Sequence, residues 1–294
     1  METLNVEIVC DGDSSSATFV IRNILKRSRH NCSLHQWNAE YREDTDIIYF
    51  HYGGILTDNS SIVENFLKKK RDYKWIAGIR GRLNFKRWLK NGGFHDFVFL
   101  LDGVSCANER FRVLSEEKGL SNVFVCHSGV DTEAFSVKPP PKEFCIGWAG
   151  SGYAGSKMFG NFLRLPFPKR TSAYDFGTSR KFVDMPSFYD KVGVYVSTSV
   201  EEGSPLPPKE AASSGRPVVA IDVGDLCEWV PKEWLVPNFK DSYKLLIPLI
   251  EQLRDDEELY LRECKRFREI IENWDYSIIV NEYDSMFSSV CSSG

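Results

Sequence analysis

The first half of the chain alternates short apolar runs with amphipathic stretches. The apolar runs have the length and the β-branched composition of buried strands, and the stretches between them carry apolar residues at helical spacing. The predicted strands are Val6–Cys10, Asp46–His51, Lys74–Ile79, Asp96–Leu101 and Asn122–His127, and the predicted helices are Ala17–Arg29, Ser61–Arg71 and Glu109–Lys118. Strands that alternate with helices indicate a parallel sheet with helices on both faces.

The second half restarts the same pattern after Lys138-Pro-Pro-Pro-Lys142. Three consecutive prolines fit neither a helix interior nor a central strand, so this segment is predicted to be a stiff linker. The elements predicted beyond it are strands at 144–148, 193–198 and 216–222, helices within 181–192 and from 207, two long helices at 241–254 and 256–273, and a last amphipathic helix at 275–288.

These patterns predict an α/β protein with two Rossmann-like, doubly wound domains. The expected boundaries are 1–137 for the first domain, 138–273 for the second, and 274–294 for a helix that crosses back to the first. In such proteins ligands bind at the carboxyl ends of the strands, in the cleft between the domains.

Composition agrees with a globular protein of two domains. The chain has 294 residues, 42% of them hydrophobic and 27% charged, with a net charge of −4. Neither a signal peptide nor an apolar run long enough to span a bilayer is visible. The eight cysteines show no zinc-type spacing, which favours reduced thiols. We therefore expect a cytoplasmic protein and leave peripheral membrane contact open.

The most informative segment is VEEGSPLPPKEAASSGRPVVA at 200–220. Gly203 lets the backbone pass close to a ligand, and Pro207 and Pro208 favour a first helical turn. Glu210 then lies near the start of that helix, where a positive dipole suits a diphosphate. A carboxylate beside such a site can accept hydrogen bonds from sugar or ribose hydroxyls.

This segment resembles the E-x7-E motif of GT4-like retaining glycosyltransferases, which have the GT-B fold. Glu202 and Glu210 form the pair, and Ala211, Gly215 and Pro217 follow in register. The resemblance implies that Glu202 contacts the donor sugar and that Glu210 holds the ribose. It also implies that Gly203, Ser204, Pro205 and Leu206 lie along the sugar and phosphates. One departure is Pro208-Lys209, where the family usually has apolar residues before the second glutamate.

Other segments resemble the same family in order and spacing. They are NVFVCHSGVDTEAF at 122–135, FCIGWAGSGYAGSK at 144–157, MPSFY at 185–189, and the C-terminal stretch 274–286. In the family, the loop after the first strand of the second domain often carries an arginine and then a lysine on the diphosphate. Lys157 fits the lysine, and Ser151 stands in place of the arginine.

The stretch between Lys157 and Met185 is short, and no helix–strand unit is assigned to it from sequence. It carries Arg164, Lys169, Arg170, Arg180 and Lys181. These cations either replace the missing arginine or form a solvated basic loop. Base recognition in the family depends on this region, so both a UDP-sugar and a GDP-sugar remain open as the donor.

Three features of the first half are candidates for a role at the site. The loop with Gly12 and Ser14–Ser16 follows the first strand and either approaches the donor or simply caps the helix. Asp11 and Asp13 form a D-x-D pair, but its place on the first strand argues against the metal site of GT-A enzymes. His51 ends one strand, and Arg80 ends another, where it could stabilise charge on the leaving phosphate.

A basic and aromatic cluster lies between Lys68 and Lys90, with ten Lys or Arg and one acidic residue, Asp72. We expect it to attract an acceptor that is part of DNA, of an anionic membrane or of an anionic glycan. A solvated basic face over core aromatics explains it equally well. Its members are Lys68, Lys69, Lys70, Arg71, Lys74, Arg80, Arg82, Lys86, Arg87 and Lys90, with Tyr73, Trp75, Phe85 and Trp88 interleaved.

The sequence therefore predicts a metal-independent, retaining glycosyltransferase that moves a hexose-type sugar from a nucleoside diphosphate sugar to a hydroxyl acceptor. Glu202, Lys157 and Arg80 are the predicted catalytic residues, and no base, cofactor or metal is assigned. The acceptor is a modified base in DNA or a lipid-linked or cell-surface glycan. The alternative is a non-catalytic protein that binds nucleic acid or membrane through the basic cluster on a decayed core.

Overall fold

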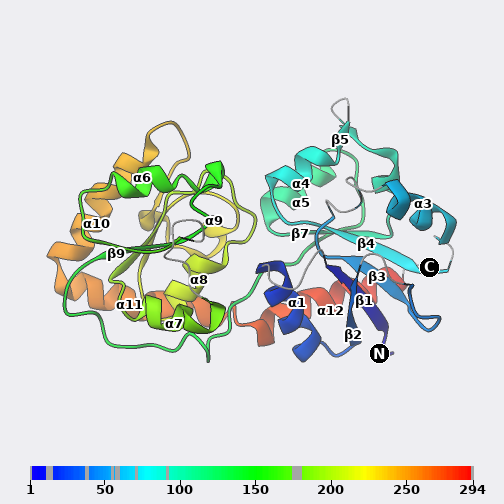
Figure 1. Cartoon of the computed structure of the whole chain (residues 1–294), viewed down its shortest axis with the longest axis horizontal. Coiled ribbons are helices and arrows are strands. Elements are labelled where there is room, and N and C mark those ends of the chain that lie inside the picture. Colours follow the sequence, from blue (N-terminus) through cyan, green and yellow to red (C-terminus); the bar gives the residue numbers. More distant parts are fainter. Residues whose placement is uncertain are drawn as a thin grey trace. The chain divides into compact units, whose positions relative to one another are not determined.

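The computed structural model describes residues 2–10, 16–36, 40–53, 56, 60–69, 72–90, 93–173 and 181–292. The chain divides into two compact units (Figure 1). The first comprises residues 1–128 and 276–294, and the second comprises residues 129–275. Each unit is a separate α/β layer structure.

The first unit is built on a six-stranded sheet among the described residues, with the order β2-β1-β3-β4-β7-β8. All neighbouring strands pair in parallel. The strands are β1 (Asn5–Cys10), β2 (Asn31–Gln36), β3 (Ile47–Phe50), β4 (Lys74–Ile79), β7 (Gly103–Cys106) and β8 (Val123–Val125). Because β1 and β3 are neighbours but β2 lies at one edge, the chain reverses its direction of winding between β1 and β3.

Helices cover this sheet, and its core contains Phe50, Phe66, Trp75 and Trp88. The C-terminal helix α12 packs beside α1 in this unit, which Figure 1 shows as red against blue. A short antiparallel pair joins β5 (Leu89–Lys90) and β6 (Gly93–Phe94). The helices are α1 (Ser16–Arg27), α3 (Ser60–Lys69), α4 (Arg82–Arg87), η1 (Asp96–Leu100), α5 (Glu109–Glu116) and α12 (Tyr276–Ser292).

The strand predicted at 96–101 is wrong: these residues form the 3₁₀ helix η1, and the sheet position belongs to β7. A short apolar run cannot distinguish a strand from a helical turn by its pattern. Burial shows which segment belongs to the sheet: Phe99 and Leu100 of η1 are exposed, whereas all residues of β7 are buried. β7 packs closely under α12 because Gly103 has no side chain. A Cβ at this position would lie only 2.9 Å from Val290 Cγ2 of α12.

The second unit is built on a five-stranded parallel sheet in the described part of the chain, with the order β10-β9-β11-β12-β13. Its strands are β9 (Ile146–Gly150), β10 (Lys169–Ala173), β11 (Val194–Ser197), β12 (Val218–Ile221) and β13 (Leu235–Val236). Its helices are η2 (Gly155–Lys157), α6 (Phe159–Leu163), η3 (Phe182–Asp184), α7 (Met185–Tyr189), α8 (Leu206–Ser213), α9 (Leu226–Trp229), η4 (Lys232–Trp234), η5 (Ser242–Leu245), α10 (Leu246–Asp255) and α11 (Glu257–Glu272).

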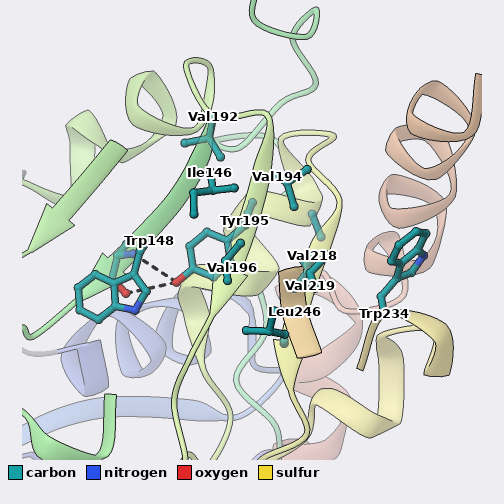
Figure 2. Packing of buried hydrophobic residues seen from close by; sticks show 14 of the residues in the cluster. Ile146, Trp148, Val192, Val194, Tyr195, Val196, Val218, Val219, Trp234 and Leu246 are labelled. Atoms are coloured by element: carbon teal, nitrogen blue, oxygen red, sulfur yellow. Dashed lines mark hydrogen bonds between the residues drawn. The ribbon is translucent and has the colours of Figure 1, made fainter. Parts of the chain in front are cut away.

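The core of the second unit lies between this sheet and its helices. Figure 2 shows side chains of β9, β11 and β12 packed together with Leu246 of α10. One polar group is enclosed there: Tyr195 Oη donates a 3.2 Å hydrogen bond to the carbonyl oxygen of Ala149, across β11 and β9. This bond ties together the two strands whose ends carry the candidate site.

The stretch between Lys157 and Met185, unassigned from sequence, contains a compact helix–strand unit. Helix α6 has five residues, and β10 pairs with β9 at the sheet edge. Phe159 and Phe162 of α6 pack against Trp148 of β9, with ring centroids 4.5 and 6.3 Å away. The helix is too short to show a periodic pattern, so its tertiary contacts define it.

The boundary between the two units lies between residues 128 and 129, whereas the sequence predicted it between residues 137 and 138. Residues 129–137 belong with the second unit, so the triproline segment lies inside that unit. The bond from Val130 N to Trp274 O (3.0 Å) and the bridge of Val130 with Asp275 explain this division. They hold the entering and leaving segments of the second unit side by side. No helix among the described residues is long and apolar enough to cross a membrane.

Candidate functional site

The second unit changes its direction of winding between β9 and β11. The chain goes from β9 to the edge strand β10 on one side, and from β11 to β12 and β13 on the other. In open parallel sheets, ligands bind beyond the carboxyl ends of the strands at such a point. Two loops leave the sheet there: residues 151–157 after β9 and residues 198–205 after β11.

An ion pair joins these two loops. Lys157 Nζ lies 2.6 Å from Glu202 Oε1, and the two side chains are 26% and 11% exposed. The loop backbones are also joined, because Val200 N donates to Ser156 O (2.8 Å) and Thr198 Oγ1 donates to Lys157 O (3.1 Å). The structure thus brings together the cation and the first glutamate that the sequence predicted for one site.

Glu210, the second glutamate of the motif, is buried in α8 with 5% exposure. Tyr189 Oη at the end of α7 donates a 2.7 Å hydrogen bond to Glu210 Oε2. Burial raises the pKa of Glu210 to about 7, and the Tyr189 hydrogen bond opposes that rise. A carboxylate with this pKa changes its charge near neutral pH, and such groups are concentrated at functional sites.

Tyr195 connects the two glutamates electrostatically. Burial raises the pKa of Tyr195, and the charges of both Glu202 and Glu210 raise it further. Tyr195 lies within β11, so its buried phenol is close enough to both glutamates for their charges to affect it.

The start of α8 offers fewer amide donors to an anion than the sequence argument assumed. A helix leaves its first backbone N–H groups without intrahelical partners. Here Pro205, Pro207 and Pro208 lack the group, so within 205–208 only Leu206 carries an N–H. Pro205, the N-cap, makes no side-chain cap hydrogen bond. A diphosphate at this point would depend on Lys157 and on the loop before the helix.

Three residues that sequence reasoning did not assign to the site support it. Tyr189 holds Glu210, and Lys209 and Asp225 form a fully buried ion pair beneath the loop 202–205. Lys209 was visible as a departure from the family pattern. Tyr189 ends the family-like segment MPSFY, but the role of Tyr189 and of Asp225 could not be read from the sequence, because each contributes through a tertiary contact.

Among the alternative cations, Lys169 is engaged elsewhere: its Nζ donates to the carbonyl oxygens of Leu165 and Phe167. Arg164, Arg170 and Lys181 are exposed. Arg180 lies outside the described residues. Ser151 directly follows β9, so it occupies the loop but brings no charge to it.

Arg80 follows β4 in the first unit, where its guanidinium is surrounded by neutral acceptors. Those acceptors are the carbonyl oxygens of His51 and Cys126 and the hydroxyls of Tyr49, Ser105 and Tyr283. A guanidinium has five N–H donors, so the five acceptors match its capacity. Its predicted role with phosphate stays a prediction, and in this arrangement the group would act through its charge.

His51 is buried beside Arg80, and its Nδ1 lies 3.2 Å from Tyr49 Oη. Burial and the neighbouring positive charge of Arg80 hold the pKa of His51 well below its usual value. The imidazole is therefore neutral at physiological pH. The loop with Gly12, Asp11, Asp13 and Ser14 lies outside the described residues.

The basic cluster separates into exposed cations and buried aromatics. Lys68, Arg82, Lys86 and Arg87 are exposed, whereas Trp75, Phe85 and Trp88 belong to the core. Trp75, Phe85 and Trp88 therefore cannot stack on nucleic acid bases, which agrees with the interpretation of a basic face over core aromatics. Lys74 lies 3.5 Å from Asp102. Lys70, Arg71 and the Lys90 side chain lie outside the described residues.

No group of metal-ligating side chains occurs in the part of the chain that the structure describes. At the switch point, the loops carry the ion pair of Lys157 and Glu202, and α8 carries the buried Glu210.

Residues 176–253 match the family model described as "Glycosyl transferases group 1". The resemblance to group 1 glycosyltransferases is thereby confirmed. The matched segment includes both glutamates, α8 and the strands β11 to β13. No curated protein matches the chain in sequence.

Comparison with solved structures confirms the GT-B fold. A sucrose-phosphate synthase from Thermosynechococcus elongatus superposes with a TM-score of 0.74 and 12% identity, over 99% of this chain and 100% of that one. Anabaena Alr3699/HepE in complex with UDP and glucose gives a TM-score of 0.70 and 13% identity, over 97% and 100%. S. aureus TarM gives 0.61 and 17%, over 92% of this chain and 58% of that one. The family match and the fold together support a glycosyltransferase.

Proposed function

We propose that this protein is a metal-independent, retaining glycosyltransferase that transfers a hexose-type sugar from a nucleoside diphosphate sugar to a hydroxyl acceptor. The observation that carries the proposal is the pair of Lys157 and Glu202, 2.6 Å apart at the switch point between β9 and β11. It supplies a cation for the diphosphate beside a carboxylate for the sugar hydroxyls.

The positions of these residues suggest a separate role for each of them. Lys157 stabilises the negative charge that develops on the leaving diphosphate, which is the kind of electrostatic help that lowers a transition-state barrier. Glu202 orients the sugar through its hydroxyl groups, and Glu210 accepts hydrogen bonds from the ribose. A leaving-phosphate oxygen takes the proton of the acceptor hydroxyl, so no protein base is assigned.

The donor is a UDP- or GDP-sugar. The solved structures of Alr3699/HepE contain UDP, UDP with glucose, or UDP-glucose, which supports UDP as the first nucleotide to examine. The metal-independent mechanism is supported by Lys157, because a positioned ammonium can neutralise diphosphate charge that a divalent cation otherwise neutralises.

We place the acceptor beside the basic cluster of the first unit. The exposed cations there suit an anionic acceptor, and Leu83 between them is 56% exposed. An exposed leucine among cations supports a lipid-linked or cell-surface glycan. The burial of Trp75, Phe85 and Trp88 removes the stacking platform that single-stranded DNA would use.

The deciding experiment measures nucleoside diphosphate released from a panel of UDP- and GDP-sugars, with and without EDTA. We expect release from one donor that EDTA does not reduce and that Glu210→Ala abolishes. Glu143→Ala, on an exposed residue next to the triproline segment, is the matched control. The anomeric configuration of the product, read by NMR, tests retention.

The second candidate is a non-catalytic protein that binds nucleic acid or membrane through the basic cluster. It predicts that no donor is bound or turned over and that Glu210→Ala has no effect on ligand binding. The ion pair of Lys157 and Glu202 argues against a decayed core, since a partly exposed ion pair with no other use contributes little to stability.

A further inference from the structure

A buried ion pair lies beneath the loop that carries Glu202. The side chains of Lys209 and Asp225 have no exposure to solvent, and Lys209 Nζ lies 2.5 Å from Asp225 Oδ2. Removing two charges from water is costly, and an apolar pair would often be at least as stable. The family pattern also has apolar residues before the second glutamate, so core packing alone does not account for Lys209.

Ser204 of the loop is the third member of this cluster. Lys209 Nζ donates a 2.7 Å hydrogen bond to Ser204 Oγ, and Ser204 Oγ donates a 2.5 Å bond to Asp225 Oδ2. A serine hydroxyl has a single proton. Because that proton goes to Asp225, the hydroxyl is used to fix the loop in this arrangement.

Asp225 holds the same loop through its backbone. Its N–H donates a 3.0 Å hydrogen bond to the carbonyl oxygen of Gly203. Gly224 makes this approach possible: it has a φ of +60°, and a Cβ there would lie 2.4 Å from Gly203 O. The segment 224–225 therefore contacts both residues that follow Glu202.

Trp274 completes the enclosure of the cation. Lys209 Nζ lies 4.3 Å from the centroid of the Trp274 ring, at the distance of a cation–π interaction. This contact stabilises the ammonium where water is excluded. It also fixes the direction in which the lysine side chain reaches back from α8 to residue 204.

We infer that Lys209 and Asp225 are positioning residues that act through Ser204 to preset the loop 203–204 for the diphosphate of the donor. The inference rests on the proposed function. Its physical reason is the proline-rich start of α8, which leaves Leu206 as the only N–H within 205–208. The loop must therefore present its own groups, and a loop ordered before binding loses less conformational entropy when the ligand arrives.

The test titrates UDP and GDP separately into wild type, Ser204→Ala, the double variant Lys209→Met/Asp225→Ala, and the triple variant, by calorimetry. The double variant removes both charges together, so neither is left buried alone. We expect Ser204→Ala and the double variant each to weaken binding about tenfold, the scale of one hydrogen bond to a charged group. The triple variant is expected to bind no more weakly than either, because all three residues act through one contact.

Kinetics give a second readout. In Ser204→Ala and in the double variant, we expect the donor KM to rise while kcat stays within about twofold, because the loop is no longer ordered before the donor binds. Lys265→Met/Glu269→Ala removes an exposed pair in α11, with side chains 80% and 62% exposed, and is the control with no expected effect. Ser204→Ala leaves the buried pair intact, so it tests the loop even where the double variant is too unstable to purify.

The outcomes separate the two hypotheses. Failure of wild type to bind either nucleotide would overturn the proposed function and this inference with it. Binding by wild type that is unchanged in the double variant would overturn the inference alone. Losses that add in the triple variant would also overturn it, because Ser204 would then contact the ligand independently of the pair.

Discussion

Tyr189 Oη donates a 2.7 Å hydrogen bond to Glu210 Oε2, and both side chains are buried, with 0% and 5% exposure. The second glutamate of the motif is thus held from α7, a separate helix. A buried carboxyl with one neutral donor can accept further hydrogen bonds, as the proposed ribose contact requires. The same arrangement makes the protein sensitive to pH.

The free energy of unfolding should depend on pH through Glu210. Burial raises its pKa from 4.5 to about 7, although the bond from Tyr189 opposes the rise. Between these values the folded state binds more protons than the unfolded state, so this group's contribution falls as pH increases. We expect Glu210→Gln to gain stability relative to wild type across that window, by at most about 3 kcal/mol. Urea unfolding at a series of pH values measures it, and a parallel shift of both proteins would contradict the assignment.

Tyr189→Phe should destabilise the fold while leaving its packing in place. The change removes the hydroxyl that donates to Glu210, so the pKa of Glu210 should rise further. Loss of one buried hydrogen bond should cost about 1–3 kcal/mol in unfolding free energy. Tyr153→Phe is the matched control because Tyr153 is 73% exposed. Equal stability of the two variants would show that the hydroxyl of Tyr189 is not important.

Lys157→Met should reduce turnover far more than stability. The pair with Glu202 is partly exposed, so its loss should change the unfolding free energy by about 1 kcal/mol or less. Loss of a charge that stabilises the leaving diphosphate should lower kcat by about 100-fold or more. Lys142→Met, an exposed lysine next to the triproline segment, serves as control. Donor turnover near the wild-type rate would remove Lys157 from the mechanism.

Gly224→Ala should impair both folding and nucleotide binding. Its φ of +60° strains any residue with a Cβ, and that Cβ would lie 2.4 Å from Gly203 O. We expect a lower melting temperature and weaker UDP binding. Gly160→Ala in α6 is a sharp control, since a Cβ there meets no atom within 4 Å. Alanine also favours helix over glycine by about 1 kcal/mol. A Gly224→Ala protein as stable as Gly160→Ala would contradict the close approach of the two loops.

Reversal of charge in the basic cluster should weaken use of an anionic acceptor. Lys68, Lys86 and Arg87 are exposed, and their joint replacement by glutamate should weaken binding to anionic vesicles and reduce its dependence on salt. Replacement of the exposed Lys138, Lys142 and Lys232 makes the same change in net charge elsewhere. Vesicle sedimentation compares the two proteins. An equal loss in both would show that only net charge matters.

The sequence alone predicted β1, β3, β4, β8, β9, β11 and β12, the doubly wound architecture and the glutamate pair, but it missed β2, β7, β10 and β13. Each of these predictions depends on local information: strands such as Val218–Ile221 are runs of apolar residues, and Glu202 and Glu210 are close along the chain. The family resemblance placed Lys157 on the loop after the first strand of the second unit, and the structure has it at the end of that loop, in η2. The pattern failed at 96–101, because the short apolar run after Asp96, most of which forms η1, has too few residues to show a period.

Only the tertiary structure decided what surrounds these residues. The bond of Tyr189 to Glu210 joins residues 21 positions apart, and the bond of Lys209 to Asp225 joins residues 16 apart. Neither pair has a sequence signature, because their meeting depends on how α7, α8 and the start of α9 pack on one sheet. Burial is likewise a property of the packed unit. It raises the pKa of Glu210 and removes Lys209 from water, whereas the same side chains in an open loop would be ordinary solvated charges.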